Sequence, residues 1–107
     1  MNYGSMESEE YINKFQVTIA FIMDDTFMNY VPDHRTYINY LINKGIIDSY
    51  TVSMVTLKSW MVINAPTREE VKELLMRSPL YKYWTYDIDE IFVFDGQGYR
   101  LPALQLN

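Results

Sequence analysis

The stretch KSWMVINAPTREEVKELLMRSPLYKYWTYDIDEIFVF, residues 58–94, carries the strongest structural signals in this chain. Residues 59–64 combine large apolar side chains without a solvent-facing alternation, which predicts a central strand covered on both faces. The sequence TREE at residues 67–70 is a capping box that starts a helix, and Pro79 ends that helix. Residues 84–94 then alternate between apolar and acidic side chains, as in a strand with one exposed face.

The segment before this stretch has the same succession of strand, helix and strand. Residues 14–23 predict a strand with two largely apolar faces, and residues 46–55 predict an edge or near-edge strand. Between them a helix is expected to begin near Pro32, and Gly45 supplies the left-handed residue that stops it. The buried stripe of this helix is expected to hold four apolar residues, Tyr37, Ile38, Leu41 and Ile42.

The order of elements is therefore βαββαβ, which predicts a ferredoxin-like α+β fold: a four-stranded antiparallel sheet with two helices on one face. We expect this domain to span residues 14–98, between an acidic, flexible tail at residues 1–13 and a C-terminal tail at residues 99–107. Two predicted strands are apolar on both faces, so we expect a second copy of the sheet to cover the open face and form a homodimer. The C-terminal tail is a candidate for packing on that partner.

Composition excludes several classes of protein. The 107 residues suffice for one domain, and the absence of cysteine excludes disulfides and Cys-based metal sites. The net charge of −5 opposes generic nucleic-acid binding. The longest apolar run, residues 19–23, is too short to cross a membrane, and the acidic N-terminus is unlike a signal peptide. We therefore expect a cytoplasmic protein without cofactor, metal, nucleic-acid partner or membrane attachment.

Residues 53–91, SMVTLKSWMVINAPTREEVKELLMRSPLYKYWTYDIDEI, resemble the muconolactone isomerase-like branch of the dimeric α+β barrel superfamily. The resemblance lies in Trp60, the capped acidic helix and the sequence SPLY at residues 78–81. A second match, to a helix of YCII-related proteins in the same superfamily, rests on Pro32, His34, Tyr37, Leu41, Lys44 and Gly45. Together the two matches span residues 14–94.

This resemblance implies a barrel built from the two facing sheets of a homodimer, with a small-molecule cavity between sheet and helices. The activity that names the family is a cofactor-free proton shift, which converts an unsaturated lactone acid into its isomer. The resemblance thus implies an isomerase acting on a small unsaturated acid or lactone. The alternative is a ligand-binding or assembly module that keeps the barrel without the chemistry.

His34 is the only histidine, and it lies in the first turn of the first predicted helix. The positive end of the helix dipole disfavours the imidazolium there, so a neutral imidazole could take a proton from a carbon beside a carbonyl. In YCII-related proteins a similar histidine is proposed to work with an aspartate, and Asp24 or Asp25 is the candidate partner here. The alternatives are a surface histidine with local hydrogen bonds and an aspartate pair that simply ends a strand.

Ten Tyr, five Phe and two Trp residues make up 16% of the chain, a composition suited to pockets and subunit interfaces. Trp60, Tyr81 and Trp84 are candidates to stack on a flat ligand, while Lys58 or Lys82 would meet its carboxylate. The alternative is that these side chains fix the second helix to the sheet or form the dimer contact.

Overall fold

The structure is a computed structural model that describes residues 12–96 of the chain. The tail predicted for residues 99–107 lies outside the described residues, and so does the tail predicted for residues 1–13 apart from Ile12 and Asn13. Asn13 belongs to the first strand rather than to a tail. All the helices and strands predicted from the sequence fall within the described part of the chain.

Four antiparallel strands form one sheet in the order β2-β3-β1-β4. The strands are β1 (Asn13–Phe21), β2 (Ile47–Ser53), β3 (Lys58–Ala65) and β4 (Trp84–Glu90). β1 and β3 are central and β2 and β4 are the edges, as the sequence predicted for β2 and β3. This order, with a helix between β1 and β2 and another between β3 and β4, confirms the ferredoxin-like α+β fold.

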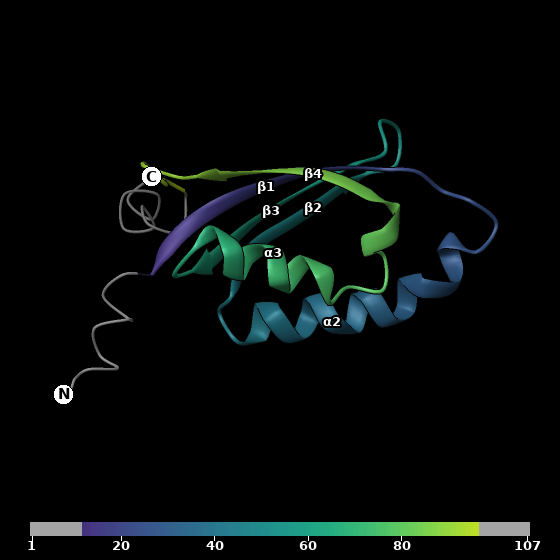
Figure 1. Ribbon diagram of the computed structural model, residues 1–107, viewed down its shortest axis with the longest axis horizontal. Helices are drawn as coiled ribbons and strands as arrows, with labels where there is room; N and C mark the ends of the chain where they lie inside the picture. The colour runs from purple at the N-terminus through teal and green to yellow at the C-terminus, as the bar shows by residue number, and fades with distance from the viewer. Residues whose placement is uncertain (1–11, 97–107) are drawn as a thin grey trace, which may run out of the picture.

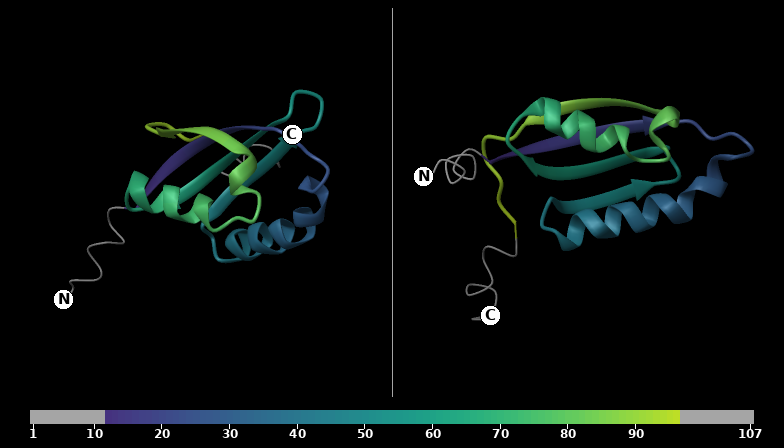
Figure 2. Two further views of the ribbon diagram at one scale, coloured as in Figure 1. Left: turned by 45° about the vertical axis from the view of Figure 1, so that its right-hand side comes forward. Right: turned by 60° about the horizontal axis from the view of Figure 1, so that its bottom comes forward.

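Both α-helices lie on the same face of the sheet, so the domain has two layers (Figure 1). α2 (Val31–Asn43) packs along β2, and α3 (Arg68–Met76) packs against β3 and β4 (Figure 2). Two short 3-10 helices, η1 (Phe27–Tyr30) and η2 (Tyr81–Tyr83), precede α2 and β4. Among the described residues, no helix covers the opposite face of the sheet.

The hydrophobic core fills the space between the sheet and the helices, and every strand and both α-helices contribute to it. In β1, every second residue from Phe15 to Phe21 is buried, as expected for a strand with one face toward a core. The largest side chains with almost no exposed surface are Val17, Ile19, Ile38, Ile47, Met61, Ile63 and Val71. Burial of each aliphatic side chain of this size stabilises the fold by about 1.5–3 kcal/mol.

α2 buries a stripe that includes a histidine. Its buried residues are His34, Ile38 and Leu41, which are four and three positions apart. Ile42 was predicted to belong to this stripe but is 41% exposed, because it lies at the edge of the face that these three residues define. Gly45 has a φ of +77°, which confirms the predicted left-handed stop.

α3 begins and ends at its predicted signals. The hydroxyl of Thr67 accepts a hydrogen bond from the amide of Glu70 at 3.2 Å and so caps the helix. Val71 and Leu75 are buried against the sheet. The helix ends before Pro79, which has no amide hydrogen and clashes with the preceding turn of a helix.

The last strand is shorter than predicted. β4 ends at Glu90, whereas the sequence predicted a strand as far as residue 94, and Phe92 is 100% exposed. β4 pairs with β1, and β1 begins at Asn13. The Ile91 amide still donates to the Lys14 carbonyl at 2.8 Å, and within residues 12–96 the pairing of β4 with β1 ends there, close to the start of β1.

The open face of the sheet is more polar than predicted. On β1 this face carries Gln16, Thr18 and Ala20, and on β3 it carries Trp60 and Val62. Large apolar side chains thus lie on both faces of β3 only. The prediction that β1 is apolar on both faces is wrong, because every second position of β1 from Gln16 to Ala20 is polar or small.

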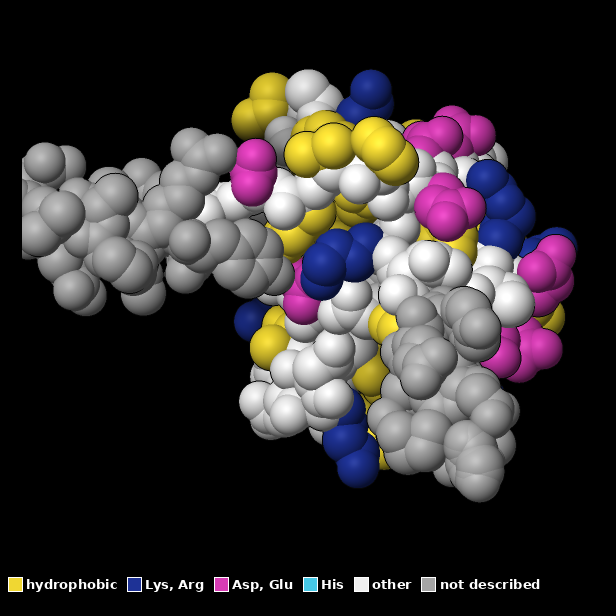
Figure 3. Space-filling model, turned by 90° about the vertical axis from the view of Figure 1, so that its left-hand side faces the viewer, with side chains coloured by type: hydrophobic (Ala, Val, Ile, Leu, Met, Phe, Trp, Pro, Cys, Tyr) yellow, Lys and Arg dark blue, Asp and Glu magenta, His cyan; other side chains and the backbone are white. Residues whose placement is uncertain are grey.

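Charged side chains of both signs are interspersed at the end of the domain shown in Figure 3, where hydrophobic side chains also reach the surface. Basic side chains therefore do not gather into one patch on this end. No helix in the described part of the chain is both long and apolar enough to cross a membrane.

Candidate ligand-binding site

His34 lies inside the domain, in the first turn of α2, and only 2% of its surface is exposed. Its Nδ1 atom is 2.8 Å from the hydroxyl oxygen of Ser78, and its Nε2 atom is 2.9 Å from the hydroxyl oxygen of Tyr50. The ring of Trp84 packs edge-on against it, with the ring centroids 5.6 Å apart. The alternative of a surface histidine with local hydrogen bonds is therefore wrong.

Burial keeps the imidazole of His34 neutral. Removal from water, with a smaller contribution from the Arg35 guanidinium, lowers the pKa of His34 from 6.5 to about 4. The sequence predicted the same direction from the helix dipole, but it did not reveal the burial that lowers this pKa. At pH 7 the neutral ring offers one N–H donor and one acceptor nitrogen.

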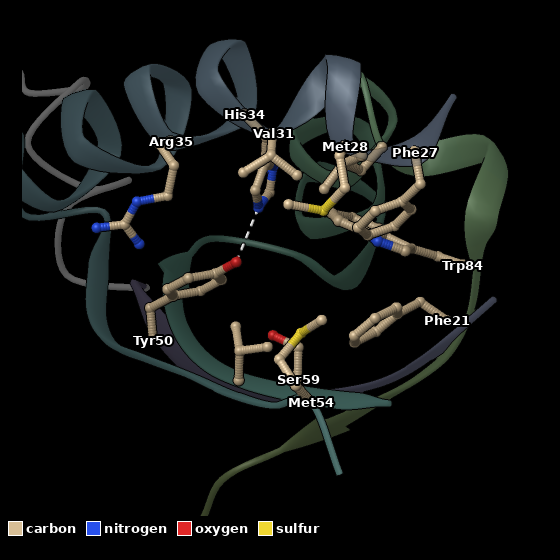
Figure 4. Close-up of a pocket in the computed structure, with 12 residues that line it drawn as sticks. Phe21, Phe27, Met28, Val31, His34, Arg35, Tyr50, Met54, Ser59 and Trp84 are labelled. Atoms are coloured by element: carbon tan, nitrogen blue, oxygen red, sulfur yellow. Dashed lines mark hydrogen bonds between the residues drawn. The ribbon is translucent and has the colours of Figure 1, made fainter. Parts of the chain in front are cut away.

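A cavity of about 150 Å³ lies between α2, η1 and the sheet, and His34 forms part of its wall (Figure 4). Eight lining residues are apolar: Phe21, Phe27, Met28, Val31, Val52, Met54, Leu80 and Trp84. The four polar lining residues are His34, Arg35, Tyr50 and Ser59. An engineered apolar cavity of about the same volume binds benzene, so this cavity has room for a ligand of roughly one small ring.

The cavity opens to solvent through a rim of apolar side chains. Met28, Val52 and Met54 line the cavity and are also exposed at the surface. Methionine is unbranched and flexible, so this rim can adapt to ligands of different outline. A mostly apolar cavity with a few convergent polar groups is the usual form of a small-molecule site.

Tyr50 reaches the cavity because β2 contains a bulge. Ile47 pairs with Ile63 and Tyr50 pairs with Met61, so three positions on β2 span two positions on β3. The extra residue turns both Ile47 and Tyr50 toward the helices, where strict alternation would have placed them on opposite faces. Burial raises the pKa of Tyr50, so its hydroxyl stays protonated and can bond to His34.

Arg35 places a positive charge at the edge of the cavity. Its side chain extends from α2 beside Tyr50 (Figure 4) and is exposed to solvent. Within residues 12–96 no carboxylate pairs with it, and the ion pair that does form there joins Lys14 and Asp48. A guanidinium in this position can bind the carboxylate of a ligand.

Asp24 and Asp25 follow β1 but do not reach His34. The Asp24 carboxylate accepts hydrogen bonds from the Thr26 amide at 2.9 Å and from the Tyr83 hydroxyl at 3.0 Å, which ties the segment after β1 to η2. Asp25 is exposed in the same turn. Within the described residues, no three His, Asp or Glu side chains gather closely enough to hold a metal ion.

Of the five predicted ligand-binding residues, Trp84 lines the cavity and the other four do not. Lys58 and Trp60 lie on the open face of the sheet, away from the helices. Tyr81 and Lys82 belong to η2 and contact other aromatic side chains outside the cavity.

The residues that complete the site, Tyr50, Ser78 and Arg35, were not predicted. One signal for Tyr50 was present, because the alternation of residues 46–55 placed it on the same side as Val52 and Met54, and all three line the cavity. Ser78 was recognised as the residue before a proline and as part of the sequence SPLY that carries the family resemblance, but not as a partner of His34. No local pattern distinguished Arg35 from other exposed cations.

The fold and the cavity together define a ferredoxin-like α+β domain with a ligand-sized site between the sheet and α2. No protein-family model matches this chain, and no curated protein matches it. The crystal structure of muconolactone isomerase is similar, with a TM-score of 0.65 and 17% sequence identity over 78% of this chain and 92% of that chain. A match at this low sequence identity establishes the fold alone. The structural similarity confirms the predicted muconolactone isomerase-like fold. The resemblance to YCII-related proteins stays a prediction.

Proposed function

We propose that this protein binds a small, largely apolar molecule bearing a carboxylate in the cavity beside His34. The cavity itself carries the proposal: it is about 150 Å³ in volume and most of its lining residues are apolar. Its polar groups His34, Arg35 and Tyr50 lie together at one end, and aromatic rings lie at the other (Figure 4). The apolar walls would hold the body of the ligand and Arg35 its carboxylate.

Catalysis is the second candidate function: a proton shift on an unsaturated acid or lactone, as the resemblance to muconolactone isomerase implies. The observation in its favour is the neutral imidazole of His34 on the cavity wall. A base with a pKa of about 4 is weak at pH 7, and the bond from Nε2 to Tyr50 would have to open first. Binding requires neither step, so it ranks first.

We also infer that two copies of the chain pair through the open faces of their sheets. The absence of a helix over this face, within residues 12–96, supports this pairing. So does Trp60, because large aromatic side chains are enriched at subunit interfaces. A two-fold arrangement would place the same face of each copy in the contact.

Binding is tested with benzoate, a one-ring carboxylate, titrated into ¹⁵N-labelled protein and followed by NMR. We expect shifts at cavity residues, and we expect Val52→Trp to abolish them because the larger side chain fills the mouth of the cavity. The matched control is Val55→Trp, in the turn after β2 at a position that is 95% exposed and outside the cavity. Equal binding by both variants would contradict a ligand site here.

The same titration separates the two parts of the proposal. Arg35→Gln should weaken benzoate binding about two- to fivefold, as for an exposed charge pair, and leave benzyl alcohol unaffected, while Arg68→Gln on α3 should change neither. Catalysis is tested separately, by incubating the protein with muconolactone in D₂O. An isomerase would catalyse the incorporation of deuterium into the lactone, and the His34→Gln variant would not. Binding of the lactone without exchange would favour the binding module.

A further inference from the structure

A chain of hydrogen bonds joins three separate segments at the polar end of the cavity. Ser78 follows α3, His34 lies on α2 and Tyr50 lies on β2. The Ser78 Oγ to His34 Nδ1 distance is 2.8 Å, and the His34 Nε2 to Tyr50 Oη distance is 2.9 Å. Each of these hydrogen bonds needs one donor and one acceptor. Which group donates in each bond therefore decides which hydrogen atom is left to face the cavity.

The direction of this hydrogen-bond chain is fixed at Ser78, which is buried. Its hydroxyl oxygen already accepts a hydrogen bond from the Leu80 amide at 3.0 Å. If His34 Nδ1 also donated to this oxygen, the Ser78 hydrogen would have no acceptor within the described part of the chain. A buried donor without an acceptor costs about 1–3 kcal/mol. Ser78 therefore donates to Nδ1, and the neutral imidazole carries its hydrogen on Nε2.

The hydrogen on Nε2 determines the role of Tyr50. His34 donates to the Tyr50 oxygen, so the Tyr50 hydrogen points away from His34. Ser59 also lines the cavity, but it donates its hydrogen to the Thr51 carbonyl at 2.9 Å. With its hydrogen given to Thr51, the Ser59 oxygen can only accept a hydrogen bond, and a ligand oxygen in the cavity can compete with it for the Tyr50 hydrogen. Of these two hydroxyl groups, only Tyr50 has a hydrogen to offer a ligand.

We propose that the Ser78–His34–Tyr50 chain holds the Tyr50 hydroxyl as a hydrogen-bond donor for the carbonyl oxygen of a ligand. Tyr50 is the contact residue, and His34 and Ser78 are positioning residues. This inference rests on the ligand-binding function proposed above, and it narrows the ligand class to small apolar carboxylates that also carry a ketone, ester or lactone carbonyl. His34 then acts by orienting Tyr50 and not by accepting a proton from the ligand.

The first test reads the tautomer of His34 directly. His34 is the sole histidine, so ¹⁵N NMR distinguishes its protonated from its unprotonated ring nitrogen without ambiguity of residue. We expect a protonated Nε2 and an unprotonated Nδ1 at pH 7. Ser78→Ala should mix the two tautomers, whereas Ser78→Thr keeps a hydroxyl and should preserve Nε2–H. A protonated Nδ1 in the unaltered protein would overturn the proposal, and this result requires no variant to fold.

The second test compares two probes of nearly equal shape, cyclohexanone and methylenecyclohexane, which differ in one oxygen atom. We expect cyclohexanone to bind about three- to tenfold more tightly, as for one net hydrogen bond. Tyr50→Phe should remove this preference, and Tyr40→Phe, at an exposed position on α2, should keep it. Equal affinities, or a preference that survives Tyr50→Phe, would overturn the proposal.

Failure of the inference and failure of the proposed function give different results. If neither probe binds although benzoate does, the binding function stands and the Tyr50 contact falls. If benzoate fails to bind as well, the binding function falls too, while the tautomer measurement still reports the direction of the hydrogen-bond chain. If both probes bind equally and the tautomer is Nδ1–H, the cavity is a ligand site and the directed chain is wrong.

Discussion

At the scale of single residues, the burial of His34 makes the stability of the protein depend on pH. The pKa of this histidine is 6.5 when exposed and about 4 in the folded protein. At pH 7 the ring is neutral in both states. Between pH 6.5 and about 4 the unfolded chain binds a proton that the folded protein does not. The free energy of unfolding therefore decreases as the pH is lowered, by roughly 3 kcal/mol at about pH 4.

Denaturant unfolding measures this effect against His34→Gln, which has no titratable ring. We expect the stability of the unaltered protein to fall more steeply than that of the variant from about pH 6.5 down to about pH 4. Carboxylates titrate in both proteins, so their contribution cancels in the difference. Parallel stability profiles for the two proteins would contradict the burial of a neutral histidine.

The sequence identified His34 but not the groups that bind it. Tyr50 is 16 positions away and Ser78 is 44 positions away, so both contacts depend on how α2 packs against the rest of the domain. The contact with Tyr50 also depends on a bulge at the start of β2, which the sequence pattern did not reveal. Asp24 or Asp25 was the predicted partner because both lie at the end of the first strand, but the Asp24 carboxylate is engaged by Thr26 and Tyr83.

At the scale of helices and strands, the Thr67 cap offers a measurable contribution. Thr67→Ala removes the acceptor for the Glu70 amide at the start of α3, and we expect a loss of about 1 kcal/mol in the free energy of unfolding. Thr36→Ala is the matched control, because Thr36 is exposed on α2 and its hydroxyl donates to the Pro32 carbonyl. This control should change stability by less than about 0.5 kcal/mol. Equal losses in urea unfolding would show that the cap is unimportant.

Local signals predicted the elements better than they predicted element ends. Gly45 and Pro79 fix where the helices stop because their backbone chemistry acts at the residue itself. The end of β4 depends instead on where its neighbour β1 begins. β1 lies about 75 positions earlier in the sequence, so no local pattern reveals this end. The apolar run at residues 91–94 was therefore interpreted as strand, although the pairs between β4 and β1 in the described part of the chain end at Glu90.

At the scale of the whole molecule, the open face of the sheet predicts a dimer. We expect sedimentation equilibrium to give twice the chain mass of 12.8 kDa, and Trp60→Glu to give the single-chain mass because it places a charge in the contact. Tyr40→Glu, on the exposed side of α2, should leave the mass unchanged. A single-chain mass for the unaltered protein at high concentration would disprove the pairing.

The strand order also bears on how the domain can be re-engineered. β1 begins the described domain and β4 ends it, yet the two are hydrogen-bonded neighbours, with Phe15 opposite Glu90. The turn between β2 and β3 lies in an exposed loop, where Val55 packs against nothing in the core. Circular permutation that joins the old ends through a linker and opens the chain at this turn would keep every strand pair. The cavity would then lie beside new chain termini, where a fused reporter could sense its occupant.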